Sequence, residues 1–580
     1  MRLIPQPQEV IFHKDEVYDL PEHALLCMPK EDRRLINAAC PVFPCVSSGA
    51  SASLYSLCCG NIDCEGSIFK AENTYDYYEI TVAQNGLIIK SISAAGLFYG
   101  IQTLKQLVHS YGKRIPLLHI RDWASCALRC DHYDLRTIYP LFPHLVEYIK
   151  EMASYKINGL LIEYEDKLPF TDLKKLRHPH GLTKEQLSEL LQTAYDHFIE
   201  IIPLQQTYGH LEYVLKHPEF IHLREQKKHV AELCPMKEES FALICRMLKD
   251  IAQMHPQSQY LHLGGDEVWS IGTCDTCKNS GLSSSALFIQ FMNRLSEYTI
   301  QLGKKPIIWH DMLKDATAQE LDLLDKRITI AIWIYSGRHM KERAMELVTK
   351  FQKAGLNVLG APSVRCWDDN AAQNYPVAEK RLYNLSQWLE IKKECTLTGI
   401  IFTNWSASFS LGNPYGLLET TRYLTFFGNE QAWNPNADQK SYPSRFFALY
   451  HGITDEAFLA DSFSMTDYYQ IPRLYLPLCH RNQITAQLLD IMQQYDEALK
   501  TGLPLQDMLF RADMFPDNEE IITFLRENYY KNYAVLDTLR PLMQKTLEQL
   551  LPRDFIPLYM HSRFFLPELY RREAKKLLKI

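Results

Sequence analysis

The sequence predicts an α/β protein: a (β/α)8 TIM barrel, preceded by a small α+β domain and followed by an α-helical domain. Over residues 120–435, short apolar runs alternate with amphipathic helical segments, a pattern typical of parallel βαβ units. Eight such runs occur at even spacing, and eight strands close this kind of barrel. Over residues 436–580 the strand pattern stops and long helical periodicity replaces it.

Residues 1–119 predict the small α+β domain. The stretch "YDYYEITVAQNGLIIKSIS" reads as two strands around a turn at Asn85-Gly86, which is a hairpin signal. The stretch "AAGLFYGIQTLKQLVHS" has helical spacing, with Leu97, Ile101, Leu104 and Leu107 on one face. Such a helix is expected to pack on the sheet that the hairpin belongs to.

The barrel prediction depends on the eight apolar runs. They lie near residues 127, 157, 199, 259, 306, 328, 356 and 398, and helical segments such as "PHLVEYIKEMASYK" and "TKEQLSELLQTAYDHF" separate them. A doubly wound open sheet is the alternative arrangement. The count of eight and the uniform spacing favour the barrel. The segment "ITAQLLDIMQQYDEALKTGL" is typical of the helical domain that follows.

Composition excludes several classes of function. The 580 residues carry a net charge of -7 with no long run of like charges, so neither nucleic acid nor a membrane surface is an expected partner. No apolar stretch is long enough to span a bilayer. The amino terminus has early prolines and no apolar core of a signal peptide. The 15 cysteines are therefore expected to be reduced thiols of a cytoplasmic protein.

The stretch "CDTC", Cys274 to Cys277, is the chain's one CxxC motif. A structural zinc site needs two further ligands at regular spacing, and no second CxxC follows. We therefore expect a pair of loop cysteines beside the active site, with no metal and no cofactor.

The predicted strand ends carry an acidic and aromatic set of side chains. The carboxyl ends of barrel strands build the active site. In chain order these positions hold Arg129, Asp131, Asp134, Glu163, Glu165, Asp166, His210, Asp266, Glu267, Trp269, Trp309, Asp311, Trp333, Tyr335 and Trp405. Carboxylates bind sugar hydroxyls and perform acid/base chemistry, and aromatic rings pack on sugar faces. The set therefore predicts a carbohydrate-active hydrolase.

Asp266 and Glu267 stand out because they follow an apolar run and two glycines in "YLHLGGDEVWSIG". A buried charge costs several kcal/mol unless it is paired or used. Other residues of the set have structural alternatives. Each tryptophan could fill the core, His210 could be a structural histidine, Arg129 could neutralise neighbouring aspartates, and Glu163 could face outward.

Several motifs together resemble glycoside hydrolase family 20, the β-N-acetylhexosaminidases. The stretch "LHLGGDE" is similar to that family's catalytic signature, and "GLFYGIQTLKQL" to the end of its small domain. The stretch "LRCDHYDL" resembles the first barrel strand, with Cys130 where glycine is usual. "IEYEDKLPF", "QTYGHLEYVLKHPEF" and "DEVWSIG" resemble the intracellular hexosaminidase D type. The resemblance covers residues 1–420.

The resemblance implies retaining, substrate-assisted hydrolysis of terminal β-linked GlcNAc or GalNAc from an oligosaccharide or glycoconjugate. Glu267 is the implied general acid and base. Asp266 is implied to orient the acetamido group and to stabilise the oxazolinium-like intermediate. The adjacent positions, where strand gives way to loop, let the two side chains address two parts of one sugar.

The resemblance also implies the substrate-binding residues. Arg129 binds ring hydroxyls, and Asp166, or Glu165 if the match slides by one residue, pairs with His210. Trp309, Trp333 and Trp405 wall the acetamido pocket. The family's usual tyrosine has no match near "GAPSVRCWDD", and Tyr335 is the candidate substitute. Ala407 stands where a glutamate is usual, and Glu419 is the candidate replacement at O4 or O6. The choice between GlcNAc and GalNAc therefore stays open.

Two other functions remain as alternatives. A degenerate glycan-binding protein would bind sugar without turnover, and a metal-dependent hydrolase would use Cys274 and Cys277. The helical tail leaves two roles open, formation of a homodimer or closure over the barrel mouth.

Overall fold

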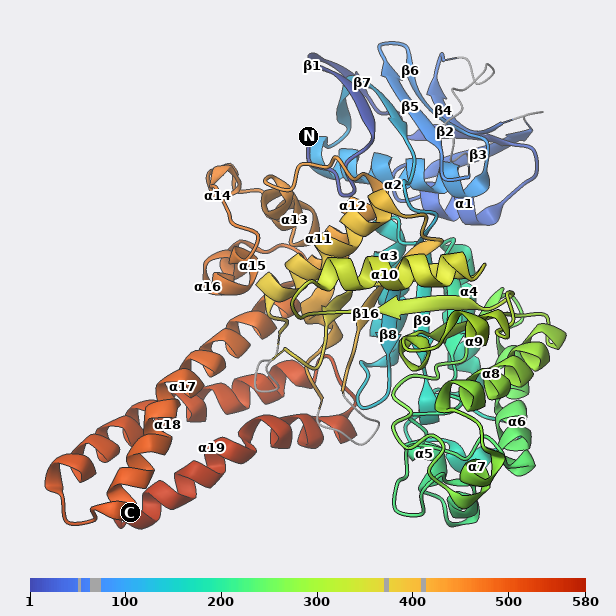
Figure 1. Cartoon of the computed structure of the whole chain (residues 1–580). Helices are drawn as coiled ribbons and strands as arrows, with labels where there is room; N and C mark the ends of the chain where they lie inside the picture. The colour runs from blue at the N-terminus through green and yellow to red at the C-terminus, as the bar shows by residue number, and fades with distance from the viewer. Residues whose placement is uncertain (51–53, 63–74, 370–374, 408–413) are drawn as a thin grey trace.

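A computed structural model describes residues 1–50, 54–62, 75–369, 375–407 and 414–580. Figure 1 shows three parts in chain order: a sheet domain, a barrel, and a long helical arm that projects from the barrel. These parts confirm the predicted fold class.

The amino-terminal domain is a seven-stranded sheet with the order β1-β7-β5-β6-β4-β2-β3. The predicted hairpin is present, although its turn residues are Gln84 and Asn85, one position earlier than expected. The predicted apolar face of α2 is fully buried. The boundary predicted at residue 119 falls inside β7, which belongs to this sheet. The elements are β1 (Glu9–Asp19), β2 (His23–Met28), α1 (Arg33–Ala39), β3 (Cys45–Ala50), β4 (Tyr55–Gly60), β5 (Tyr78–Ala83), β6 (Gly86–Ser91), α2 (Ala94–Tyr111) and β7 (Arg114–Asp122).

The barrel consists of eight parallel strands, each at one of the positions predicted from the sequence. The pairing of β16 with both β8 and β14 closes the sheet, which rules out an open doubly wound arrangement. A short additional strand, β15 (Ser363–Arg365), pairs with the end of β16. The eight strands are β8 (Leu128–Asp134), β9 (Gly159–Glu163), β10 (Glu200–Leu204), β11 (Tyr260–His262), β12 (Lys305–Trp309), β13 (Thr329–Trp333), β14 (Asn357–Ala361) and β16 (Gly399–Asn404).

The longer helices surround the barrel and pack against its strands, as α4 does on β10, α8 on β12 and α10 on β14. Helix α4, for example, starts at a capping box in which Thr183 and Gln186 bond to each other's backbone, which satisfies free N–H groups. The helices are α3 (Phe142–Ser154), α4 (Lys184–Asp196), α5 (Glu212–Leu215), α6 (Glu238–Met254), α7 (Asp275–Ser280), α8 (Ser284–Gln301), α9 (Ala318–Asp322), α10 (Met340–Lys353), α11 (Ala378–Glu394) and α12 (Arg422–Trp433). Short 3-10 turns include η1 (Glu165–Lys167) and η5 (Leu418–Thr421).

The carboxyl-terminal region is helical, as predicted. Helices α17, α18 and α19 pack on one another and form the arm in Figure 1. Arg563 of α19 donates hydrogen bonds to the carbonyls of Pro414 and Tyr415, which lie in the loop after β16. No helix in the described part of the chain is long and apolar enough to cross a membrane. The helices are α13 (Tyr442–Tyr450), α14 (Glu456–Ala460), α15 (Asp467–Gln470), α16 (Pro472–Tyr475), α17 (Gln483–Met514), α18 (Glu519–Leu547) and α19 (Ile556–Leu578).

Candidate active site

Asp266 and Glu267 lie on the loop that follows β11 at the carboxyl end of the barrel. Gly264 and Gly265, which precede them, have φ values of 63° and 88°, and this left-handed region favours glycine. A Cβ on Gly264 would lie 2.0 Å from the side-chain oxygen of Gln206. The glycines therefore permit both the turn and the close approach that place the two carboxylates.

His210 contacts both carboxylates. Its Nε2 lies 3.5 Å from Asp266 Oδ2 and 3.4 Å from Glu267 Oε2. Burial opposes protonation of His210, but the two carboxylates hold its pKa well above its usual value. Burial likewise opposes ionisation of Asp266, yet His210 holds the pKa of that carboxyl below its usual value. A protonated His210 thus faces an ionised Asp266, while the Glu267 side chain is 31% exposed and reaches toward solvent.

Asp311 is a third carboxyl group at this position. Its Oδ2 accepts a hydrogen bond of 2.9 Å from the backbone N–H of Glu267. Burial, with a further contribution from the charge of Asp266, raises the pKa of Asp311 to about 7. Asp311 therefore holds the backbone of Glu267 in place and titrates near neutral pH. The sequence had placed it at a strand end without assigning it a role.

The predicted aromatic residues come together beside the carboxylates. Trp309 is fully buried, with its ring centroid 4.2 Å from that of His262 and 5.9 Å from that of Trp405. Trp333 stacks on Tyr335 with centroids 5.5 Å apart. The Tyr335 hydroxyl accepts a hydrogen bond of 2.8 Å from Trp405 Nε1. These four residues thus form one connected aromatic wall at the ends of β12, β13 and β16.

Arg136 is a site residue that the sequence reasoning missed. It lies just past β8, where its Nε and Nη2 donate hydrogen bonds to Oδ1 and Oδ2 of Asp134, and its guanidinium lies 3.6 Å from Glu163. It also lies 5.1 Å from the ring centroid of Trp405. Glu163 is fully buried and accepts a hydrogen bond from Gln206, so it faces the barrel interior rather than outward. The sequence did contain a signal for Arg136, because it lies two residues after Asp134, which was already predicted to lie at a strand end.

Arg129 lies elsewhere, which corrects the expectation that it binds ring hydroxyls. It is the second residue of β8 and therefore lies at the amino end of the barrel. Its fully buried guanidinium forms a 3.0 Å ion pair with Asp76 of the amino-terminal domain and donates to the carbonyls of Cys126 and Lys156. All of these partners hold the protein chain together and none faces the active site. Arg129 therefore joins the amino-terminal domain to the barrel.

The expected pair of Asp166 and His210 is also revised. The carboxylate of Asp166 accepts a 2.6 Å hydrogen bond from Lys167 in η1, whereas the Nε2 of His210 is directed at Asp266 and Glu267. The alternative residue, Glu165, is buried with a positive φ of 45°. Burial raises the pKa of its carboxyl well above the usual value, against the opposing charge of Arg136.

Glu419 does not face the aromatic wall, which corrects its expected role as a binder of O4 or O6. With Tyr148, Glu151 and Arg422 it lines a cavity of about 600 Å³ that α2, α3 and α17 also border. This cavity lies outside the barrel strands, since Tyr148 belongs to α3 and stacks on the outward-facing Tyr133. The position of the family's usual glutamate, Ala407, contributes its carbonyl to Arg136.

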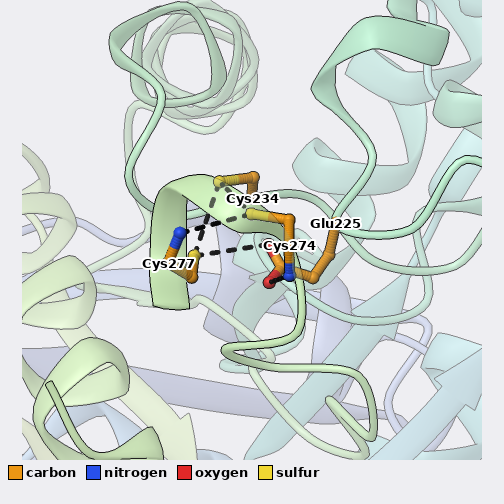
Figure 2. Close-up of side chains that lie close together, drawn as sticks. All are labelled: Glu225, Cys234, Cys274 and Cys277. Carbon is orange, nitrogen blue, oxygen red and sulfur yellow. Dashed lines mark hydrogen bonds between the residues drawn. The ribbon is translucent and has the colours of Figure 1, made fainter. Parts of the chain in front are cut away.

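The cysteines are mostly free thiols. Among the described residues, 13 cysteines are free and Cys58 is disulfide-bonded, so one cysteine departs from the expected reduced state. Cys274 and Cys277 of the CxxC motif are joined by Cys234 and Glu225, and Figure 2 shows the four side chains converging beside α7. This group was not predicted from the sequence, because its other two members, Glu225 and Cys234, do not form a second CxxC motif.

Comparisons with known proteins agree with this fold. The model of the glycosyl hydrolase family 20 catalytic domain matches residues 139–399, and that of domain 2 of the family matches residues 1–123. Hexosaminidase D of Bos taurus is 32% identical over 290 residues, which cover 48% of this chain and 84% of the bovine protein. Hexosaminidase D of Homo sapiens is 31% identical over 290 residues, 48% of this chain and 60% of the human protein.

A solved structure extends the likeness to the whole fold. The chitobiase of Flavobacterium johnsoniae has a TM-score of 0.58 and 16% identity, and the match covers 100% of this chain and 96% of that one. At this identity the match shows a shared fold only. The catalytic-domain model reaches further, because the residues that it matches include the loop that carries Asp266 and Glu267, and the bovine relative is 32% identical over 84% of its own length. The chain therefore belongs to glycosyl hydrolase family 20 and is a glycoside hydrolase.

Proposed function

We propose that this glycoside hydrolase is an exo-β-N-acetylhexosaminidase that removes terminal β-linked GlcNAc, GalNAc or both by retaining, substrate-assisted hydrolysis. The observation that carries the proposal is the pair of adjacent carboxylates in different environments. Asp266 is buried against a protonated His210, and Glu267 is partly open to solvent. The relatives named hexosaminidase D support the sugar class.

The proposed reaction has two steps. In the first, the oxygen of the substrate's own 2-acetamido group attacks the anomeric carbon, and the glycosidic bond breaks as Glu267 gives its proton to the leaving oxygen. In the second, Glu267 takes a proton from water as that water attacks the anomeric carbon and opens the oxazolinium-like ring. Two inversions at one carbon retain the configuration. Asp266, held ionised by His210, orients the acetamido N–H and stabilises the positive charge.

The aromatic wall supplies the proposed acetamido pocket. Trp333 and Trp405 are partly exposed at the strand ends, and the buried Trp309 packs on Trp405. The hydroxyl of Tyr335 accepts a hydrogen bond from Trp405, and it is the proposed donor to the acetamido oxygen. Burial holds the pKa of Tyr335 well above its usual value, so the phenol keeps its proton.

Two further roles follow from the positions of charged groups. Arg136, which packs over Trp405 and lies between Asp134 and Glu163, takes the place of Arg129 as the proposed partner of ring hydroxyls. Asp311 holds the backbone of Glu267 as a positioning residue. We also propose that the protein acts in the cytoplasm, as its free thiols favour; the disulfide at Cys58 is the exception.

Hydrolysis of p-nitrophenyl β-GlcNAc and β-GalNAc tests the proposal. The wild type is expected to release nitrophenol from one or both, and a thiazoline mimic of the oxazoline intermediate is expected to inhibit it. Asp266→Ala is expected to lower kcat by about 10²–10³-fold, the usual loss for one charge-stabilising group. If folded wild type binds the sugars without turnover, the chain is instead a glycan-binding protein. Hydrolysis that ignores the thiazoline and survives Asp266→Ala would contradict the mechanism.

A further inference from the structure

A cluster of three thiols and one carboxylate lies outside the catalytic group. Cys234 Sγ is 3.5 Å from both Cys274 Sγ and Cys277 Sγ, and Cys277 Sγ is 3.4 Å from Glu225 Oε2. One ligand atom from each of the four residues lies within 4.8 Å of every other. In Figure 2 the four side chains point toward one another from α7 and from a neighbouring loop.

Two segments distant in sequence build the cluster. An isolated antiparallel bridge between Arg224 and Leu233 brings Glu225 and Cys234, the residues next to the bridge, close to each other. The other two thiols come from the start of α7, where the Cys274 sulfur accepts the backbone N–H of Cys277. Each pair is thus fixed by the backbone structure of its own segment. This preorganisation distinguishes the cluster from a chance meeting of loop cysteines.

The spacing fits a tetrahedral metal better than a disulfide. Four ligands at the usual zinc–sulfur distance of about 2.3 Å place neighbouring sulfurs about 3.8 Å apart, close to the observed 3.5 Å. A disulfide bond is only about 2.0 Å long. Cys234 is also equally distant from its two neighbours, so a bond to either would leave the other thiol unused.

We propose that Cys234, Cys274, Cys277 and Glu225 bind one zinc ion, which ties the loop after β11 to the segment before α6. Three thiolates and a carboxylate are a donor set that selects zinc among the common divalent metals. The three thiol protons pass to solvent when the metal binds. All four positions are then filled by protein, which is the arrangement of a structural rather than a catalytic zinc site.

The segment before α6 and the loop after β11 also contact each other close to the catalytic pair, Asp266 and Glu267. Glu232 accepts the backbone N–H groups of Trp269 and Ser270. Glu225 accepts the N–H of Cys274 through its other oxygen. The zinc would therefore complete a clamp on the loop that carries Asp266 and Glu267.

Metal content of the full-length protein tests this inference separately from hydrolysis. After gel filtration, elemental analysis is expected to find about one zinc per chain, as one four-ligand site requires. Cobalt exchanged into the protein is expected to show a sulfur-to-cobalt charge-transfer band and strong tetrahedral d–d bands. Cys277→Ser is expected to lose the metal. Cys245→Ser, which alters a half-buried thiol of α6 outside the cluster, is the matched control and is expected to keep it.

Glu225→Gln keeps the shape of the side chain and removes its charge. It is expected to fold and to bind zinc at least about 10-fold more weakly, because a neutral amide replaces a charged ligand and even a change outside the ligand set costs about 10–100-fold; this keeps the inference testable if Cys277→Ser does not fold. Absence of zinc with no cobalt spectrum, an unchanged zinc content in Cys277→Ser, or a disulfide between two of the three cysteines would each overturn the inference. None of these readouts depends on which sugar the barrel hydrolyses.

Discussion

Asp311 links the ionisation of the site to its stability. An exposed aspartate has a pKa of about 3.9, whereas burial, with the charge of Asp266, raises that of Asp311 to about 7. Between these values the folded protein keeps a proton that the unfolded chain has lost. The contribution of Asp311 to the free energy of unfolding is therefore fully present below pH of about 4 and is lost as pH rises to about 7.

Asp311→Asn removes this loss. The difference in free energy of unfolding between the variant and wild type is expected to be larger at pH 8 than at pH 5. The pKa of Asp311 rises by about three units, and each unit corresponds to about 1.4 kcal/mol, so this difference can grow by at most about 4 kcal/mol. Urea unfolding at both pH values measures the gain. Asp496→Asn is the control, because Asp496 of α17 is also a buried carboxyl with a pKa of about 7. Both variants should change stability, but only Asp311→Asn should alter the pH profile of hydrolysis. Parallel stability curves for Asp311→Asn and wild type would contradict this account.

At the scale of elements, the end of β11 depends on its two glycines. Gly264 has a positive φ, and a Cβ there would strike the side chain of Gln206, which in turn holds Glu163. Gly303 has a similar φ of 79°, but a Cβ there would meet nothing within 4 Å. An added side chain at Gly303 therefore causes backbone strain alone, whereas one at Gly264 causes backbone strain and also crowds the active site.

Gly303→Ala is expected to cost about 1–2 kcal/mol, the strain of a left-handed residue with a side chain, and to leave kcat/KM unchanged. Gly264→Ala is expected to cost more and to lower kcat/KM as well, because Gln206 must move. Thermal unfolding and hydrolysis of an aryl substrate measure both effects. Equal losses in the two variants, with activity intact, would show that the contact with Gln206 is unimportant.

Elements were predicted from the sequence more fully than side-chain directions were. All eight barrel strands lie where their apolar runs predicted them, because strand and helix periodicity is a local property. The inward direction of Glu163 was not predictable, since a strand buried on both faces has no alternating pattern to set its orientation. Glu419 and the thiol cluster depend on how loops fold over the barrel. Local sequence does not encode contacts such as that between Cys234 and Cys277.

At the scale of the whole molecule, buried ion pairs join the amino-terminal domain to the barrel. Arg129 pairs with Asp76, and Lys156 pairs with Asp122, with all four side chains buried. Trp433 at the end of α12 packs on Arg129 and donates to Asp122. The family motif led the sequence reasoning to place Arg129 in the site, although its place at the start of β8 puts it at this interface.

Arg129→Ala is expected to destabilise the protein by about 3–5 kcal/mol, the usual cost of leaving a buried charge unpaired, and to leave KM unchanged. The double variant Arg129→Ala/Asp76→Ala should lose less than the sum of the two single variants, because neither charge is then left alone. Arg136→Ala is the comparison, and it should raise KM as well as lower stability. If Arg129→Ala raised KM and left stability unchanged, Arg129 would instead be a substrate-binding residue.

The proposed mechanism depends on attack by the substrate's own acetamido oxygen. The most direct measurement is kcat/KM for aryl glycosides whose acetamido methyl group carries zero, one, two or three fluorines. Each fluorine withdraws electrons from the attacking oxygen and leaves the leaving group unchanged. Under substrate-assisted hydrolysis, kcat/KM is expected to fall steeply with every fluorine added. A rate that stays constant across the series would mean that a protein carboxylate attacks instead, and the role assigned to Asp266 would be wrong.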